Sequence, residues 1–458
     1  MAVSKSYSLP LATFILFLSL SSSSAHNKPH IHRPYHAHFS CQGSFSKVYA
    51  FGDSYTDTGN ALRMGGLKSL IGGFLSHTPF GSSVFNPQKG RLCDGRLVVD
   101  FLCEALSLPQ LPPYKEFSGN FSSGVNFAIA GSTCLAAEFF IKKQIAHSLM
   151  WKGVPESYST QINWYDKFLL GMDCKGKDER SCRAEMNNAL FWIGAMGVND
   201  YARILGSAIS TRWLTDKSVG NVCDLVQVCP EGENKKPHTI TLQKSMKIAF
   251  QFPSLYNVMQ HQYQISNSKG HSIQLPKLAL FSRFFLCLPL ALLEKGAKYM
   301  VVQGLPPIGC LPSCLQLSPS HDRDNLGCAS GINSAIKTHN ELLQRKLAAF
   351  QKQYPGCSII YADYWNAYRA ILMNATKYNF DEPFKTCCGA GGGPFNCDLN
   401  LMCGALGTST CSDPSKHMVW DGIHLTEAMY KHLTDLFLYK GYCKPSFEEL
   451  IRKKKRMM

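Results

Sequence analysis

Residues 47–60, KVYAFGDSYTDTGN, run from an apolar stretch into a series of small and polar residues. The mostly apolar residues 47–51 predict a short buried strand, which Gly52 ends. Ser54 follows directly, so its hydroxyl is expected to leave the strand just before a helix, where negative charge is favoured. This arrangement suits a nucleophile, although Ser, Asp and Thr at strand ends are more often helix N-caps.

The same alternation continues along the chain. Apolar runs at residues 125–129, 189–193, 298–302 and 358–361 predict four more strands. Two helical faces are expected, formed by Ile336, Leu343, Leu347 and Phe350 and by Met429, Leu433, Leu436 and Phe437. The last helix is expected to begin after the N-cap Thr426 and to end at Gly441. This alternation predicts a mostly parallel sheet covered on both faces, with ligands beyond the carboxyl ends of its strands.

A serine nucleophile needs a base that takes its proton. His424 is the best candidate, because Asp421 lies three residues earlier and a turn could bring its carboxylate onto the imidazole Nδ1. The carboxylate would then fix the tautomer and stabilise the imidazolium. The simpler interpretation is a capping aspartate and a surface histidine.

Donors for an oxyanion are expected after the second and third strands. Because Gly131 has no side chain, its N–H can approach a substrate closely. Asn199 could direct its side-chain amide to the same substrate oxygen. Alternatively, Gly131 forms a tight turn and Asn199 an Asx-turn. The order of these parts along the chain favours the catalytic interpretation.

Six segments together resemble the plant GDSL esterase/lipase family of the SGNH hydrolases. They are FGDSYTDTGN at 51–60, GRLVVDF at 95–101, GVNFA at 124–128, GVNDY at 197–201, LPPIGC at 305–310 and WDGIH at 420–424. The resemblance implies a flavodoxin-like, three-layer α/β/α fold with a five-stranded parallel sheet. It also implies hydrolysis of carboxylic esters with neither a cofactor nor a metal. The absence of G-x-S-x-G agrees, since other α/β hydrolases carry that motif.

The resemblance also implies roles for single residues. The nucleophile is Ser54, the base His424 and the acid Asp421, while the oxyanion donors are Ser54 N–H, Gly131 and Asn199. Three alternatives stay open: an O-acetylesterase acting on cell-wall polysaccharide, an acyltransferase with the same site, and a catalytically impaired secreted protein.

The third alternative depends on residues 222–286, which interrupt a single hydrolase domain at 47–443. In the family that this chain resembles, a helix after the GVNDY segment runs directly into a segment like residues 292–302. We interpret the intervening residues as a foreign segment inserted in a helix, because they show no clear period. The milder interpretation is a surface lid or loop, although structureless loops of this length are uncommon in compact domains.

The N-terminus predicts secretion to the cell exterior. Residues 1–25 have the apolar run and small residues of a signal peptide, and residues 26–46 form a His-rich segment expected to be a flexible linker. In a secreted chain, Asn120 and Asn374 are candidate glycosylation sites, because each begins an Asn-x-Ser/Thr motif.

Secretion also makes the 19 cysteines candidates for disulfides rather than metal ligands, and no C-x-x-C pair is present. The odd number leaves at least one thiol unpaired or bonded between chains. A stapled segment is expected where five cysteines crowd together, at 387, 388, 397, 403 and 411. The pairing cannot be deduced from sequence.

The formal net charge of +15 is unevenly distributed. Residues 452–456 carry five positive charges within a C-terminal tail at 444–458, which is expected to be a solvated, disordered end. Partners expected for a secreted protein are an ester substrate and, at the tail, acidic polysaccharide or anionic lipid rather than nucleic acid. The sequence contains no stretch of 18 apolar residues, so no transmembrane helix is predicted.

Overall fold

The structure is a computed structural model. It describes residues 39–64, 90–145, 155–204, 207–226 and 297–457. The predicted signal peptide and most of the His-rich segment lie outside these residues, as do residues 227–286 of the predicted insertion. Within the described ranges, no helix is long and apolar enough to cross a bilayer.

The centre of the fold is a sheet whose strands follow the predicted ones. Its parallel strands are β1 (Val48–Phe51), β2 (Gly124–Asn126), β3 (Leu190–Ile193), β4 (Tyr299–Gln303) and β5 (Ser358–Ala362). They lie in the order β2-β1-β3-β4-β5. The expectation of five strands is wrong by one, because β10 (Cys443–Lys444) adds an antiparallel strand at the β5 edge.

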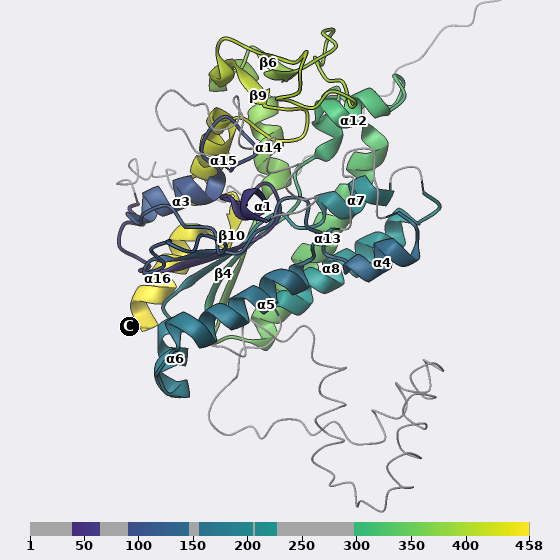
Figure 1. The fold of residues 1–458 in the computed structure, drawn as a ribbon. Helices are drawn as coiled ribbons and strands as arrows, with labels where there is room; N and C mark the ends of the chain where they lie inside the picture. The colour runs from purple at the N-terminus through teal and green to yellow at the C-terminus, as the bar shows by residue number, and fades with distance from the viewer. Residues whose placement is uncertain (1–38, 65–89, 146–154, 205–206, 227–296, 458) are drawn as a thin grey trace, which may run out of the picture. The chain divides into compact units, whose positions relative to one another are not determined.

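Helices cover both faces of the sheet (Figure 1). One face packs against α5 (Tyr158–Phe168), α6 (Glu179–Met186), α8 (Thr211–Val226) and α13 (Ser330–Gln353). On the other side lie α3 (Val98–Leu106), α14 (Tyr364–Leu372), α15 (Glu427–Tyr439) and α16 (Phe447–Met457). Shorter helices are α1 (Asn60–Arg63), α4 (Ala137–Lys142), α7 (Val198–Ile204) and α12 (Pro312–Leu317). Because successive side chains of a buried strand point to opposite faces, every strand contributes to both layers of core.

Both predicted helical faces point into the core. Ile336, Leu343 and Leu347 of α13 are buried, and Phe350 packs against the same core while partly buried. All four predicted residues of α15 are buried too, and Thr426 is its N-cap, accepting a hydrogen bond from the Met429 N–H. However, α15 ends at Tyr439 rather than at Gly441.

The C-terminal residues 444–458 do not form the expected disordered end. They contain α16, whose residues Phe447, Leu450 and Ile451 are buried. Lys454 is buried as well. Its ammonium donates to the Ser44 carbonyl at 2.7 Å and lies 4.6 Å from the centre of the Phe45 ring. The apolar spacing of three and four residues lets the helix pack despite its charge.

The start of the predicted insertion also differs from expectation. Residues 222–226 belong to α8, so helical structure continues past the expected boundary. Val222 is buried in the core that α8 shares with α13. Residues 222–226 therefore belong to the same helix as the residues before them.

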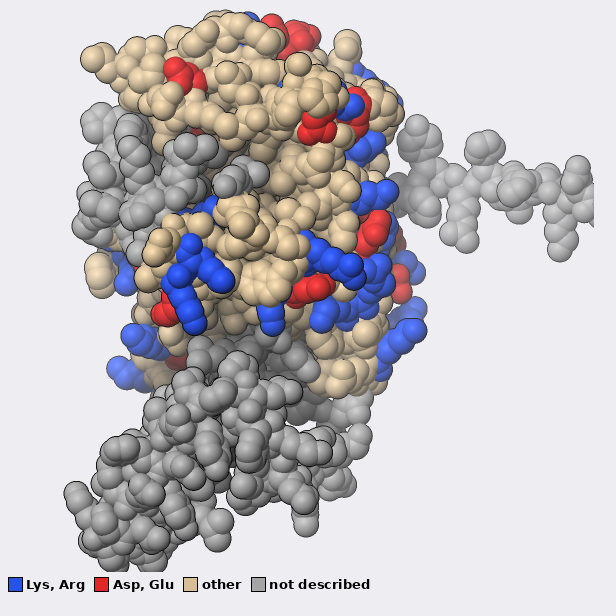
Figure 2. Space-filling model, turned by 90° about the vertical axis from the view of Figure 1, so that its right-hand side faces the viewer, with Lys and Arg blue, Asp and Glu red and all other residues tan. Residues whose placement is uncertain are grey.

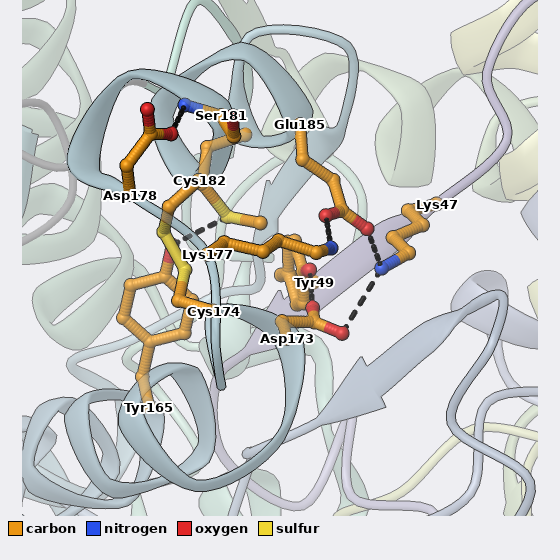
Figure 3. Close-up of a disulfide and its surroundings, with 11 residues drawn as sticks. Lys47, Tyr49, Tyr165, Asp173, Cys174, Lys177, Asp178, Ser181, Cys182 and Glu185 are labelled. Carbon is orange, nitrogen blue, oxygen red and sulfur yellow. Dashed lines mark hydrogen bonds and ion pairs between the residues drawn. A yellow bond between two sulfur atoms is a disulfide. The ribbon is translucent and has the colours of Figure 1, made fainter.

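A polar cluster braces the amino end of β1 (Figure 3). Lys47 donates to Asp173 at 3.0 Å and to Glu185 at 2.5 Å, and the Tyr49 hydroxyl donates to Asp173. The disulfide Cys174–Cys182 links the two segments that carry these carboxylates. The cluster therefore ties α6 to the strand that leads to Ser54.

The cysteine-rich segment is stapled as predicted. Its disulfides are Cys387–Cys411 and Cys388–Cys403, whereas Cys397 forms none with the described residues. A further disulfide, Cys310–Cys328, lies outside it. Small strands extend this region: β6 (Glu382–Thr386), β7 (Cys388–Gly389), β8 (Ser409–Thr410) and β9 (His417–Val419). Figure 2 shows Lys and Arg side chains gathered in a band across one face, with several Asp and Glu side chains above the band.

Candidate active site

Three of the candidate residues, Ser54, Gly131 and Asn199, follow the carboxyl ends of the neighbouring strands β1, β2 and β3. The loop after β1 contacts the loop after β2, because the Ser132 hydroxyl donates to the Gly52 carbonyl at 3.0 Å. The loop after β3 joins them through the Asn199 amide, which donates to the Ser132 carbonyl at 3.0 Å. Parallel strands end at one edge of a sheet, so residues far apart in sequence meet there.

Ser54 occupies a tight turn directly after β1. The Asp53 carbonyl accepts from the N–H groups of Thr56 and Asp57 at 3.0 and 2.9 Å, which closes the turn. Ser54 is buried. The expected helix begins only at Asn60 and has four residues, so Ser54 does not stand at a helix N-terminus. The turn itself, rather than a helix, presents the serine.

Gly52 makes this turn possible. Its φ of +153° lies outside the range that other residues favour, and a Cβ there would come within 2.9 Å of Thr56. Gln161 of α5 holds both backbone groups of Gly52, accepting from its N–H at 3.0 Å and donating to its carbonyl at 2.7 Å. The position of the Ser54 turn is therefore fixed from the core side.

His424 and Asp421 lie together on the loop between β9 and α15. His424 Nδ1 is 2.7 Å from Asp421 Oδ2, and because a carboxylate accepts, Nδ1 carries the proton. The Asp421 carboxylate also accepts from the N–H groups of Ile423 and His424, at 3.1 and 2.8 Å. Burial alone would raise the pKa of Asp421, but the charge of His424 and these hydrogen bonds hold that pKa below its ordinary value.

The other ring nitrogen of His424 is free to act as a base. His424 Nε2 is buried and has no hydrogen-bond partner in the part of the chain that the structure describes. Tyr55, next to Ser54, reaches this loop: its hydroxyl donates to the Ile423 carbonyl at 2.8 Å, and its ring centre lies 5.7 Å from that of His424. The Ser54 turn and the His424 loop are thus in contact.

Three N–H donors remain unpaired near Ser54. Neither the Ser54 N–H nor the Gly131 N–H has an acceptor among the described residues. Gly131 has a φ of +79°, the left-handed region that favours glycine. The Asn199 amide uses one N–H for Ser132 and has a second to offer. Unpaired N–H groups are rare in folded proteins, so these three are candidate donors to an oxyanion.

Two buried aspartates hold these loops, and the sequence analysis did not single them out. Asp57 accepts from the N–H groups of Gly59, Asn60, Ala61 and Ala130, which ties the Ser54 turn to the Gly131 loop. Asp200 accepts from Cys134 and Leu135 at 2.8 and 2.9 Å. Their only signal in the sequence was their place beside Ser54 and Asn199.

The segment at 95–101 supports the His424 loop. Arg96 forms two hydrogen bonds to Glu427 Oε1, at 2.9 and 2.7 Å, and Asp94 accepts from the Glu427 N–H at 2.8 Å. Glu427 is the first residue of α15, three residues after His424. These contacts fix the point where the loop enters the helix.

Both candidate glycosylation sites are accessible. Asn120 and Asn374 are exposed. Asn120 Oδ1 accepts from the Ser122 N–H at 3.1 Å, in a local turn of the surface chain. Glycosylation at either site stays a prediction.

Comparison with known proteins shows that this chain is similar to ester hydrolases. The family model described as GDSL-like Lipase/Acylhydrolase matches residues 48–228 and 275–437. A GDSL esterase/lipase of Arabidopsis thaliana is 36% identical over 451 residues, which cover 97% of this chain and 96% of the relative. Acetylajmalan esterase 2 of Rauvolfia serpentina is 31% identical over 398 residues, 86% of this chain and 90% of the relative. The family match leaves out residues 229–274, which fall inside the predicted insertion.

Proposed function

Because this chain belongs to the family of GDSL-like lipases and acylhydrolases and is a hydrolase of ester bonds, we propose that it is a secreted serine esterase that works through an acyl-enzyme. The observation that carries the proposal is the pair formed by His424 and Asp421. One imidazole nitrogen is held by a buried carboxylate at 2.7 Å, and the other has no partner in the described residues. That is the state a general base requires.

The first half of the reaction makes the acyl-enzyme. His424 Nε2 takes the proton of the Ser54 hydroxyl, whose oxygen attacks the ester carbonyl carbon. The carbonyl oxygen becomes an oxyanion that accepts from the N–H groups of Ser54 and Gly131 and from the Asn199 amide. His424 then gives its proton to the departing alcohol, and Asp421 stabilises the imidazolium between the two transfers.

The second half regenerates the enzyme. Water, deprotonated by His424, attacks the Ser54 ester, and the same donors hold the second oxyanion. His424 then returns the proton to the Ser54 oxygen as the acid leaves. If another alcohol takes the place of water, the acyl group moves to that alcohol and the site acts as a transferase. His424 carries the proton in each transfer of both halves of the reaction.

The finer features of the sequence analysis belong to the same proposal. The strand order β2-β1-β3-β4-β5 supports a flavodoxin-like assignment. Secretion is supported by the stapled cysteines, since disulfides persist in oxidising compartments. On α16, Arg452, Lys455 and Arg456 are exposed and could contact acidic cell-wall polysaccharide.

A second candidate function is hydrolysis of acetyl esters on larger alcohols. It is favoured by the relative named acetylajmalan esterase, whose name specifies an acetyl ester. Lipid esters and acetyl esters make different demands on the acyl side of the site, so turnover against acyl-chain length separates the two functions.

The direct test is a serine-directed fluorophosphonate probe applied to the purified chain. We expect the probe to label Ser54, located by mass spectrometry of the digested protein. A parallel panel should run from p-nitrophenyl acetate to long-chain p-nitrophenyl esters, triacylglycerol and acetylated xylan and pectin. A folded protein that takes up no label and turns over no ester contradicts the proposal.

Asn199 offers a graded test of the oxyanion site. We expect Asn199→Ala to lower kcat by ~10² to 10³ with little change in KM, because one donor to the transition state is lost. Asn221→Ala is a matched control, since its amide also donates to a backbone carbonyl, that of Cys134, at 2.8 Å. A loss confined to KM, or an equal loss in the control, contradicts the role of Asn199.

A further inference from the structure

Asp53 lies between Gly52 and Ser54, and its carboxyl group is poorly compensated. The residue is completely buried. Its Oδ1 accepts one N–H, that of Tyr55, at 3.0 Å. Its Oδ2 is buried without any hydrogen-bond partner in the described part of the chain. A buried carboxylate with so few donors is costly, since ionised groups in protein interiors need pairing.

The neighbouring acids Asp57 and Asp200 receive more compensation, although burial raises their pKa as well, that of Asp200 to about 7. Asp57 accepts four N–H groups, and Asp200 accepts two. Positive charge also acts on both, from Arg91 on Asp57 and from Arg203 on Asp200. Asp53 has neither advantage.

The groups around Asp53 favour its neutral form. Among the described residues, the groups that interact with Asp53 most strongly include Asp57, Asp200, Tyr55, Tyr364 and Cys134, and none of these is a cation. Burial raises the pKa of Asp53 to about 8, and the charges of Asp200 and Asp57 act in the same direction. Tyr364 also has a buried hydroxyl without a partner among the described residues. A protonated Asp53 carries no charge, so it does not need the donors or the cation that a buried carboxylate requires.

We propose that Asp53 is a neutral carboxylic acid in the active protein and that loss of its proton switches the Ser54 site off. The inference rests on the proposed function of Ser54 and adds a form of regulation to it. A carboxylate one residue from Ser54 would repel the oxyanion that forms beside the Ser54 N–H. A neutral acid holds the turn without that charge. Asp53 is therefore a positioning residue, and the pH determines whether its carboxyl group is neutral or charged.

The test compares the wild type with Asp53→Asn across a range of pH. The wild-type kcat/KM should fall above about pH 8, by about tenfold per unit once the acid has ionised. Asp53→Asn should keep activity within about tenfold at neutral pH and should lose this alkaline decrease, because an amide is neutral throughout. Asp200→Asn is the matched control, and whatever its activity, its alkaline decrease should remain.

Two results would overturn the proposal. One is a folded Asp53→Asn variant that is inactive at every pH. The proposal requires that an uncharged side chain at this position is enough for activity. The other is a wild-type kcat/KM that stays flat to about pH 9.5 while circular dichroism shows an intact fold. The wild-type profile decides the matter even where the variant does not fold.

A stability measurement separates this inference from the function of the site. An acid whose pKa is raised in the folded state binds its proton more tightly there than when unfolded. Its contribution is complete below the unfolded pKa, ~3.9, and is lost as pH rises towards the folded value. The Tm of the wild type minus that of Asp53→Asn should therefore fall between about pH 5 and pH 8. A constant difference means that Asp53 is ionised throughout, whether or not the protein hydrolyses esters.

Discussion

Ser54→Ala is expected to lower kcat/KM for p-nitrophenyl esters by roughly 10⁴ to 10⁶, because the atom that forms the acyl-enzyme is removed. The fold should persist, since the Ser54 hydroxyl makes no hydrogen bond to another described residue and alanine occupies less space. Steady-state kinetics, with circular dichroism as the check on folding, measures both effects. The fluorophosphonate label should disappear from the variant.

Ser358→Ala provides a matched control for this change. Ser358 is also buried and its hydroxyl has no partner among the described residues, but it begins β5, at the opposite end of a strand from the site. We expect this variant to keep wild-type turnover. If Ser54→Ala retains turnover within about tenfold of the wild type, then Ser54 is not the nucleophile.

His424→Ala should cost about as much as Ser54→Ala, because the two residues act as one unit and each is ineffective without the other. The double variant should therefore be no slower than either single variant. In the wild type, kcat/KM should also fall towards acid pH, since a protonated imidazole cannot accept the serine proton. These three measurements use the same ester assay.

His432→Ala is the control for the histidine. His432 lies on α15, where its ring packs against the rings of Tyr378 and Phe380 at 5.0 and 5.6 Å between centres. Its loss should leave turnover unchanged. A double variant far slower than both single variants would mean that Ser54 and His424 contribute independently, which contradicts a shared catalytic unit.

The contact between Asp421 and His424 shows how closely a local pattern can anticipate a site. Three residues separate them, and the turn predicted between them brings the carboxylate to the imidazole at 2.7 Å. The strand that leads to Ser54 was equally evident, because the apolar residues 48–51 are all buried. Such features depend on neighbours in sequence, so sequence patterns can reveal them.

Other features depend on partners that are distant in sequence. The Asp200 carboxylate reaches N–H groups 66 and 65 residues away, and Arg96 reaches Glu427 across 331 residues. The sixth strand pairs Cys443 with Ala362 through two residues only, too few for a recognisable period. Asp53 likewise interacts with Asp200 of α7 and Tyr364 of α14, which are distant in sequence.

The sequence by itself determined the family, the five parallel strands and the order of the candidate catalytic residues, because apolar periodicity and short motifs are local properties. Only the tertiary structure decided which cysteines pair, that α16 packs instead of fraying, and which donors remain unpaired beside Ser54. The physical reason is that pairing and burial depend on which surfaces meet. A side chain's own neighbours do not specify the group that will satisfy or desolvate it.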